Sequence, residues 1–145
     1  MTQESLGAAK DDARTAPARP LALTLVAAPD AVGVMRRAAA DVAKEHGADD
    51  DLTFDVALAV SEAVTNAVKY AYGRKREGKV EMSARVRDRF LEISIRDWGK
   101  GFGTGSSDGL GIGLALIARV STEMTVVQEG RGTQVRMRFL LAPSQ

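Results

Sequence analysis

Apolar positions in the first half of the chain recur every three to four residues. Residues 30–47 place apolar side chains on one side and charged side chains largely on the other, and Gly47 closes the segment, which predicts an amphipathic helix. A second helix is predicted from about Asp51 to Tyr72. The short apolar segment 21–27 precedes both helices and predicts a first strand.

The period of the pattern falls to two after residue 78. Apolar and polar residues alternate over 79–88 and again over 90–97, which predicts two neighbouring strands joined by a hairpin turn at Asp88 and Arg89. A glycine-rich segment follows. The remaining elements expected are a helix at 114–121 and strands at 123–129 and 133–141.

This order of helices and strands predicts an α+β fold. We expect a two-layer sandwich in which helices cover one face of a mostly antiparallel, mixed sheet. Residues 1–20 mix charged residues, Ala and Pro without periodicity and are expected to form a disordered leader. The folded domain is expected to span residues 21–141.

The composition narrows the classes of function. The chain has 145 residues, 45% of them hydrophobic, which suits a single domain with its own core. Its 20 basic and 19 acidic residues are mixed along the sequence, so neither nucleic acid nor an anionic membrane surface is an expected partner. No cysteine is present, and the single histidine, His46, is expected to complement the dipole of a helix end. No apolar run approaches the roughly 20 residues of a membrane span and no signal peptide is visible, so a cytoplasmic location is expected.

The segment SEAVTNAVKY, residues 61–70, carries three polar residues in an otherwise apolar helix. Glu62, Asn66 and Lys69 are spaced by four and three residues and therefore share one helix face. Such residues are costly in a dry core but suit the wall of a pocket that holds a cation and phosphates. There Asn66 offers an oxygen ligand to Mg²⁺, Glu62 can accept a proton, and Lys69 can contact a phosphate. The alternative is an ordinary helix whose polar residues face water.

Two glycine clusters carry further chemistry. Asp97 closes an alternating strand and is followed by Gly99 and Gly101, which let the backbone approach a flat or large ligand. A simple turn at the end of the strand is the alternative.

A second cluster, Gly109, Gly111 and Gly113, runs into a helix, where exposed backbone N–H groups suit phosphate. A dinucleotide-binding fold is excluded because these glycines come late and follow antiparallel-looking strands. The phosphate-loop pattern G-x-x-x-x-G-K-[ST] is also absent.

Taken together, the motifs E-x-x-x-N, D-x-G-x-G, G-x-G-x-G and a final G-T, in this order, are more specific than any one of them. In these motifs the sequence resembles the GHKL ATPase superfamily, which includes histidine kinases, type II topoisomerases and mismatch-repair ATPases and has a Bergerat-type ATP-binding fold. The short chain and the stretches APDAVGVMRRAAADVA and AVSEAVTNAVKYAYG look most like the anti-sigma-factor serine/threonine kinases of bacterial partner-switching systems. The resemblance covers about residues 21–141.

The resemblance implies a role for each motif residue. Asn66 would bind Mg²⁺ and Glu62 would be the general base. Asp97 would accept a hydrogen bond from the adenine amino group, with Thr133 supporting the adenine end. The remaining residues expected to contact ATP are Lys69, Gly99, Gly101, Gly109, Leu110, Gly111, Ile112 and Gly113.

The implied function is that of an anti-sigma factor and Ser/Thr protein kinase. It would sequester a sigma factor and use MgATP to phosphorylate a STAS-type anti-sigma-factor antagonist, and the family implies a homodimer. Arg36 and Arg37 on the first predicted helix are candidate partner contacts. Two alternatives stay open: a histidine-kinase-like ATP-binding domain, and a non-catalytic interaction module with the same fold. Only seven residues separate Gly101 from Gly109, so ATP binding is expected to be weak or to depend on a partner.

Overall fold

The computed structural model describes residues 20–72, 78–99 and 110–141, with the side chains of Leu110, Gly111, Ile112 and Glu129 left out. The leader predicted for residues 1–20, apart from Pro20, lies outside the described residues, as do Gly101, Gly109 and the short segment between them. The elements are β1 (Leu21–Val26), α2 (Pro29–Glu45), α3 (Asp50–Asn66), η1 (Ala67–Ala71), β2 (Lys79–Arg87), β3 (Phe90–Asp97), α4 (Leu110–Val120), β4 (Glu123–Glu129) and β5 (Gly132–Leu140).

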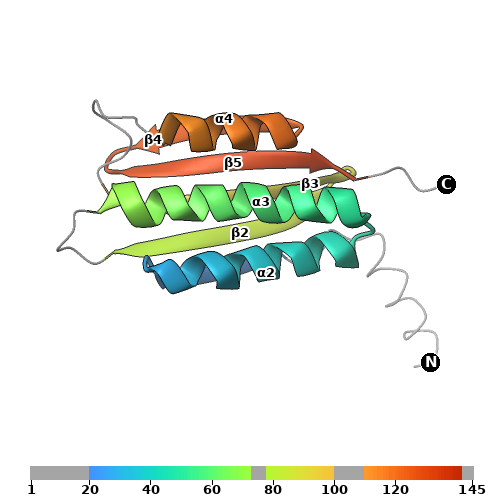
Figure 1. Cartoon of the computed structure of the whole chain (residues 1–145), viewed down its shortest axis with the longest axis horizontal. Helices are drawn as coiled ribbons and strands as arrows, with labels where there is room; N and C mark the ends of the chain where they lie inside the picture. The colour runs from blue at the N-terminus through green and yellow to red at the C-terminus, as the bar shows by residue number, and fades with distance from the viewer. Residues whose placement is uncertain (1–19, 73–77, 100–109, 142–145) are drawn as a thin grey trace, which may run out of the picture.

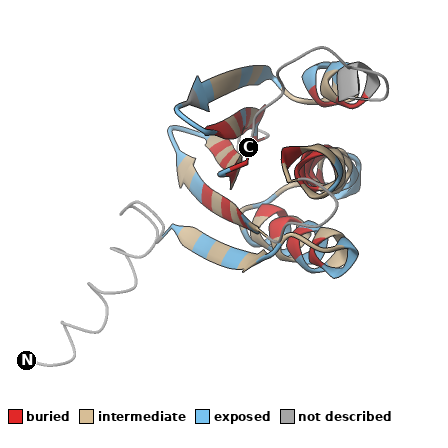
Figure 2. Ribbon diagram, turned by 90° about the vertical axis from the view of Figure 1, so that its left-hand side faces the viewer, coloured by how far each residue is buried: buried red, intermediate tan, exposed pale blue. Residues whose placement is uncertain are grey.

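The five strands form one sheet, and α2, α3 and α4 lie side by side on one of its faces (Figures 1 and 2). The strand order is β1-β2-β3-β5-β4, and each of the four pairings is antiparallel. The predicted two-layer α+β sandwich is therefore confirmed. The sheet is more uniform than the expected mixed one, because no parallel pairing occurs among the described strands.

Alternation along the strands builds the core between the two layers. In β3 the residues Leu91, Ile93 and Ile95 are buried, whereas the residues between them are only half-buried (Figure 2). Because side chains alternate between the two faces of a sheet, Asp97 points to the same helix-covered face as Ile95. The same alternation that places apolar side chains in the core therefore places the carboxyl group of Asp97 at the end of the core, where β3 ends.

The helix ends follow local rules that the sequence already contains. Gly47 has φ +91°, and its N–H donates to the carbonyl of Lys44 at 3.1 Å while that of Ala48 donates to Ala43 at 3.0 Å, which is a Schellman ending of α2. His46 Nδ1 donates to the carbonyl of Val42 at 3.0 Å, in keeping with a structural role at the helix end. No helix in the described residues is long and apolar enough to cross a membrane.

The hairpin between β2 and β3 turns at the two expected residues. Asp88 and Arg89 have φ angles of 49° and 71°, which is the conformation of a two-residue type I′ turn. Such a turn matches the right-handed twist of the strands it joins and fixes their register. That register sets which residues lie next to Asp97 at the far end of the hairpin.

Candidate active site

The three polar residues predicted to share one helix face, Glu62, Asn66 and Lys69, are called the polar stripe. Its first two residues lie on α3 and contact the region of a glycine on α4. Glu62 and Asn66 lie one helical turn apart on α3, and both face Gly113 of α4. A Cβ atom on Gly113 would lie 3.2 Å from Glu62 Oε1, 3.2 Å from Asn66 Nδ2 and 3.3 Å from Asn66 Oδ1. The missing side chain therefore leaves the space in which these two polar groups sit between the helices.

Asn66 is buried in a way that calls for a ligand. The side chain is 4% exposed, and its Nδ2 has no hydrogen-bond partner among the described residues. A buried amide without a partner is costly, so such a group points to an absent ligand. The amide offers either a donor to a phosphate oxygen or an oxygen ligand to Mg²⁺, depending on which way it is turned.

The stripe does not continue regularly to Lys69. After Asn66 the chain changes from α-helix to a π-helical turn, η1, which rotates the residues that follow relative to α3. Lys69 lies in this turn and is exposed. The helical spacing on which the three-residue stripe was predicted therefore holds for Glu62 and Asn66, and the contact of Lys69 with a phosphate stays a prediction.

Helix α4 begins at Leu110, four residues before the predicted start at residue 114. The N–H groups at the start of an α-helix have no partner within the helix, and here those of residues 110–112 are of this kind. These are the residues expected to bind phosphates, so the earlier start keeps their N–H groups available at the positive end of the helix dipole. Gly113 is thus inside the helix rather than before it.

The carboxyl group of Asp97 lies at the end of β3 and is 4% exposed. Burial raises the pKa of Asp97 above its ordinary value of 3.8, and hydrogen bonds from the backbone N–H groups of Gly99 and Thr133, together with the charge of Arg96, oppose this shift. The Gly99 bond to Asp97 Oδ1 measures 3.0 Å. The carboxyl is therefore oriented chiefly by backbone N–H groups, which suits a group that recognises a neutral donor.

Thr133 is the direct neighbour of Asp97 across the sheet. It is 2% exposed, and its Oγ1 has no hydrogen-bond partner among the described residues. A second buried polar atom of the predicted site is thus left for a ligand. Thr53 Oγ1 near the start of α3 is a further buried atom of this kind, and nothing in the structure explains it.

Close backbone contacts hold the two halves of the site together. A Cβ atom on Gly99 would overlap the carbonyl oxygen of Ala71 at the end of η1, so only glycine allows β3 to meet this turn. The turn directly follows Asn66, and it therefore ties the Asp97 end of the sheet to the helix that carries Glu62. The site combines a buried carboxyl, two buried polar atoms that have no partner in the part of the chain that the structure describes, and a helix start, which is a set suited to a nucleotide.

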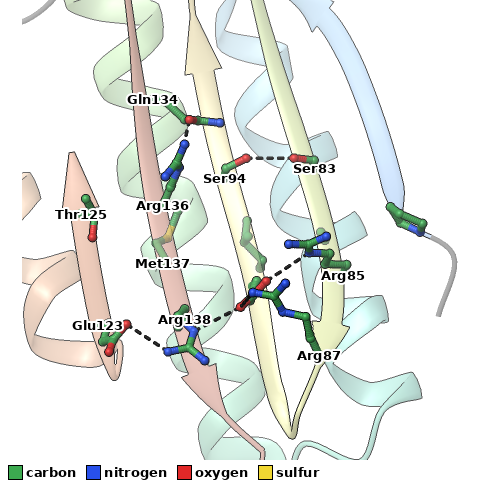
Figure 3. A pocket seen from close by; sticks show the side chains of 14 residues that line it. Ser83, Arg85, Arg87, Ser94, Glu123, Thr125, Gln134, Arg136, Met137 and Arg138 are labelled. Atoms are coloured by element: carbon green, nitrogen blue, oxygen red, sulfur yellow. Dashed lines mark hydrogen bonds and ion pairs between the residues drawn. The ribbon is translucent and has the colours of Figure 1, made fainter. Parts of the chain in front are cut away.

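The opposite face of the sheet carries charges that already have partners. Glu92 accepts from Arg85 at 3.1 Å and from Arg138 at 3.2 Å, and Arg138 also donates to Glu123 at 3.1 Å (Figure 3). These residues line a hollow of about 740 Å³, and no predicted site residue does. This ladder of ion pairs is a stabilising surface of the sheet rather than a reactive centre.

Other predicted residues lie away from the site. Arg36 and Arg37 are exposed on α2, as partner contacts would have to be. The sequence interpretation missed Tyr72, which follows η1 and makes three hydrogen bonds through one hydroxyl group. Its only sequence signal is its position next to the glycine that ends the helical pattern. No group of three or more His, Cys, Asp or Glu residues is placed to hold a metal ion within the described segments.

Comparison with known proteins finds serine-protein kinases among the relatives of this chain. The serine-protein kinase RsbW of Bacillus licheniformis is 33% identical over 131 residues, which covers 79% of this chain and 81% of that protein. RsbW of Oceanobacillus iheyensis is 37% identical over 76 residues, 52% of this chain. In that second match the chain spans about half the length of the relative, 48%.

The solved structures give the same picture. The structure of the RsbU and RsbW domains of Rv1364c from Mycobacterium tuberculosis is similar with a TM-score of 0.71 at 27% identity, covering 90% of this chain and 35% of that longer chain. The histidine kinase-like ATPase domain matches residues 25–139, which include both halves of the site. The chain therefore belongs to the family of histidine kinase-like ATPase domains.

Proposed function

We propose that the protein is an ATP-dependent serine/threonine protein kinase that also acts as an anti-sigma factor. The proposal rests on two buried polar atoms, Asn66 Nδ2 and Thr133 Oγ1, which have no hydrogen-bond partner among the described residues. Both belong to the site that includes the buried carboxyl of Asp97. A folded protein tolerates such atoms where a ligand completes their hydrogen bonds. The similarity to RsbW serine-protein kinases supports the choice of ligand and reaction.

Asp97 and Thr133 would hold the base. The carboxyl oxygen not engaged by Gly99 can accept from an exocyclic amino group, and the Thr133 hydroxyl can complete the contact to the ring. A carboxylate paired with a neutral donor rejects bases that present a carbonyl at that place, because two acceptors would then face each other. This end of the site would therefore select adenine over guanine.

Asn66 and the start of α4 would hold the phosphates and the metal. Asn66 offers an oxygen ligand at the buried end of α3, and the N–H groups of residues 110–112 can donate to phosphate oxygens. Mg²⁺, when bound, neutralises phosphate charge as the phosphoryl group is transferred. Gly113 keeps the two helices close enough for both sets of groups to reach one ligand.

Glu62 would act as the general base. It lies one turn before Asn66 on the same face, half-buried, with Oε1 directed at the space beside Gly113. From there its carboxylate can accept the proton of a serine or threonine hydroxyl as that oxygen attacks the terminal phosphorus. We propose that this hydroxyl belongs to a STAS-type antagonist, that a sigma factor is the second partner, and that exposed Arg36 and Arg37 contact one of them, in a homodimer.

The first test is calorimetry of purified protein with ATP, with and without Mg²⁺. The expected result is Mg²⁺-dependent binding that is lost in Asn66→Ala and Asp97→Asn and kept in Ser83→Ala, whose hydroxyl pairs with Ser94 on the other face of the sheet. No binding by the wild type, either alone or with its cognate antagonist present, refutes the nucleotide site and favours a non-catalytic interaction module.

The second test is phosphoryl transfer from ATP to the cognate STAS-type antagonist. The proposal expects a product stable in acid, and it expects Glu62→Gln to lose transfer while it keeps ATP binding. An acid-labile phosphoramidate instead supports a histidine-kinase-like activity. Transfer that survives Glu62→Gln refutes the role of Glu62 as base.

A further inference from the structure

The hydroxyl group of Tyr72 bridges two strands at the end of the sheet. It donates to the carbonyl of Lys79 at 2.8 Å and accepts from the N–H of Lys79 at 3.2 Å and the N–H of Trp98 at 2.9 Å. A phenolic oxygen has one hydrogen to donate and two positions at which to accept. All of them are used here, so this hydroxyl is fully committed to the backbone.

The bridge replaces a rung of the β-ladder. In the register of β2 and β3 the last pair is Val80 with Asp97, and one step further Lys79 would face Trp98. The two strands no longer bond directly at that step, and the Tyr72 oxygen connects the Trp98 N–H to the Lys79 carbonyl instead. At this end of the sheet, the side chain of Tyr72, which follows η1 in the helix layer, therefore takes the place of a direct hydrogen bond between the two backbone segments.

The ring of Tyr72 packs against a glycine that leaves space for it. A Cβ atom on Gly78 would overlap the Tyr72 ring, so the glycine just before β2 makes room for it. Ala71, the residue before Tyr72, is the one that Gly99 approaches. The segment from Asp97 to Gly99 is thus held at Trp98 by the phenol and at Gly99 by the end of η1.

The hydrogen bond between Tyr72 and Trp98 also affects the orientation of the Asp97 carboxyl group. Asp97 Oδ1 accepts from the N–H of Gly99, and the position of that N–H depends on the peptide held through Trp98. Loss of the Tyr72 hydroxyl would leave the Trp98 N–H and the Lys79 carbonyl without their partner and allow the peptide after Asp97 to turn. The carboxyl would then keep its burial and the hydrogen bond from the Thr133 N–H, but lose the direction that the Gly99 N–H gives it.

We propose that Tyr72 is a positioning residue for base recognition: its hydroxyl holds the backbone after Asp97 so that the carboxyl group faces the exocyclic amino group of the nucleotide base. This inference rests on the nucleotide site proposed above. It adds a residue to which the sequence motifs assign no role and that does not itself touch the ligand.

The test compares two ligands on three proteins. ATP and purine riboside 5′-triphosphate, which lacks the amino group, are titrated with Mg²⁺ into wild type, Tyr72→Phe and the matched control Ser83→Ala. We expect Tyr72→Phe to weaken ATP binding about fivefold, the scale of one hydrogen bond, while binding of the analogue changes less than about twofold. Ser83→Ala should change neither affinity, because its hydroxyl bonds to Ser94 on the other face.

A merely structural role for Tyr72 predicts equal losses for both ligands, and that result overturns the inference while it leaves the proposed function intact. Wild type that binds neither nucleotide refutes the proposed function and the inference together. Wild type that binds both equally well shows no recognition of the amino group and refutes the inference too.

A measurement on the wild type covers the case in which Tyr72→Phe does not fold. Because coupling between two sites is reciprocal, ATP should slow hydrogen exchange of the Trp98 amide more than the analogue does at equal saturation. Equal protection by the two ligands contradicts the inference. Greater protection by ATP supports it without any substitution.

Discussion

Substitution of Gly113 by alanine separates the stability of the fold from the function of the site. In a helix alanine is favoured over glycine by about 0.5–1 kcal/mol, so Gly113→Ala should stabilise α4. Against this gain, the new Cβ lies 3.2 Å from Asn66 Nδ2 and 3.2 Å from Glu62 Oε1, which is closer than ordinary contact. The two side chains must move by a few tenths of an ångström, and Asn66 Nδ2 has no described hydrogen bond to lose by doing so.

The net effect on folding is therefore small, with a melting temperature unchanged or raised by about 2–4 °C. The effect on the site is larger, because Mg²⁺ demands ligand distances of about 2.0–2.1 Å and near-ideal geometry. We expect MgATP to bind about tenfold more weakly, which corresponds to about 1.4 kcal/mol. Calorimetry measures the affinity, and thermal unfolding of the same samples measures the stability.

Gly33→Ala is the matched control. Gly33 lies within α2, and a Cβ there would meet only Arg36 Nη2 and Arg37 Nη1, both at 3.8 Å. This variant should gain the same helix stability and bind MgATP as the wild type does. The reasoning is refuted if Gly113→Ala binds MgATP as tightly as Gly33→Ala, or if its affinity falls only in parallel with a loss of stability.

Four further outcomes follow from the structure. Thr133→Val should leave the stability unchanged or raise it, because a buried hydroxyl without a described partner is removed, and should weaken ATP binding about threefold in calorimetry. Burial raises the folded-state pKa of Asp97 above 3.8, so its contribution to stability is complete below the unfolded pKa and is lost as pH rises through the folded one. Asp97→Asn should therefore flatten the fall of the melting temperature between acidic and neutral pH, and an unchanged profile contradicts this assignment. Gly99→Ala should lower the free energy of unfolding by about 2 kcal/mol in urea titrations, because its Cβ meets the Ala71 backbone, and a neutral result shows that the turn can yield. Glu92→Gln should lower the urea midpoint more at low than at high salt, and a loss that does not depend on salt argues against the ion-pair ladder as its cause.

Much of the fold was predictable because its rules are local. The Schellman ending at Gly47, the type I′ turn at Asp88 and Arg89, and the alternation along β3 each depend on neighbouring residues alone. The same alternation predicts that Asp97 lies on the helix-covered face. The structure places Glu62 and Asn66 against Gly113, and Asp97 beside Thr133, while the roles that the order of motifs suggested for these residues stay predictions.

Departures from the prediction occur where distant backbone segments meet. The π-helical turn η1 leaves no periodic signal in five residues of mostly helix-favouring type, and it changes the expected position of Lys69. The low helix propensity of glycine delayed the predicted start of α4, although the helix of the structure begins at Leu110. The bridge made by Tyr72 depends on three backbone atoms from two strands, which no sequence spacing reveals.

The strand order has a consequence for synthesis of the protein. Strand β5, which follows the other four described strands in the sequence, is not at an edge but between β3 and β4, so β4 cannot join the sheet until the residues of β5 have left the ribosome. Thr133 reaches Asp97 only through this final insertion. A nascent chain that already exposes Glu62, Asn66 and Asp97 therefore lacks the completed base end of the site. If the proposed function is correct, nucleotide would stabilise the finished domain and would not act as a template for the incomplete one.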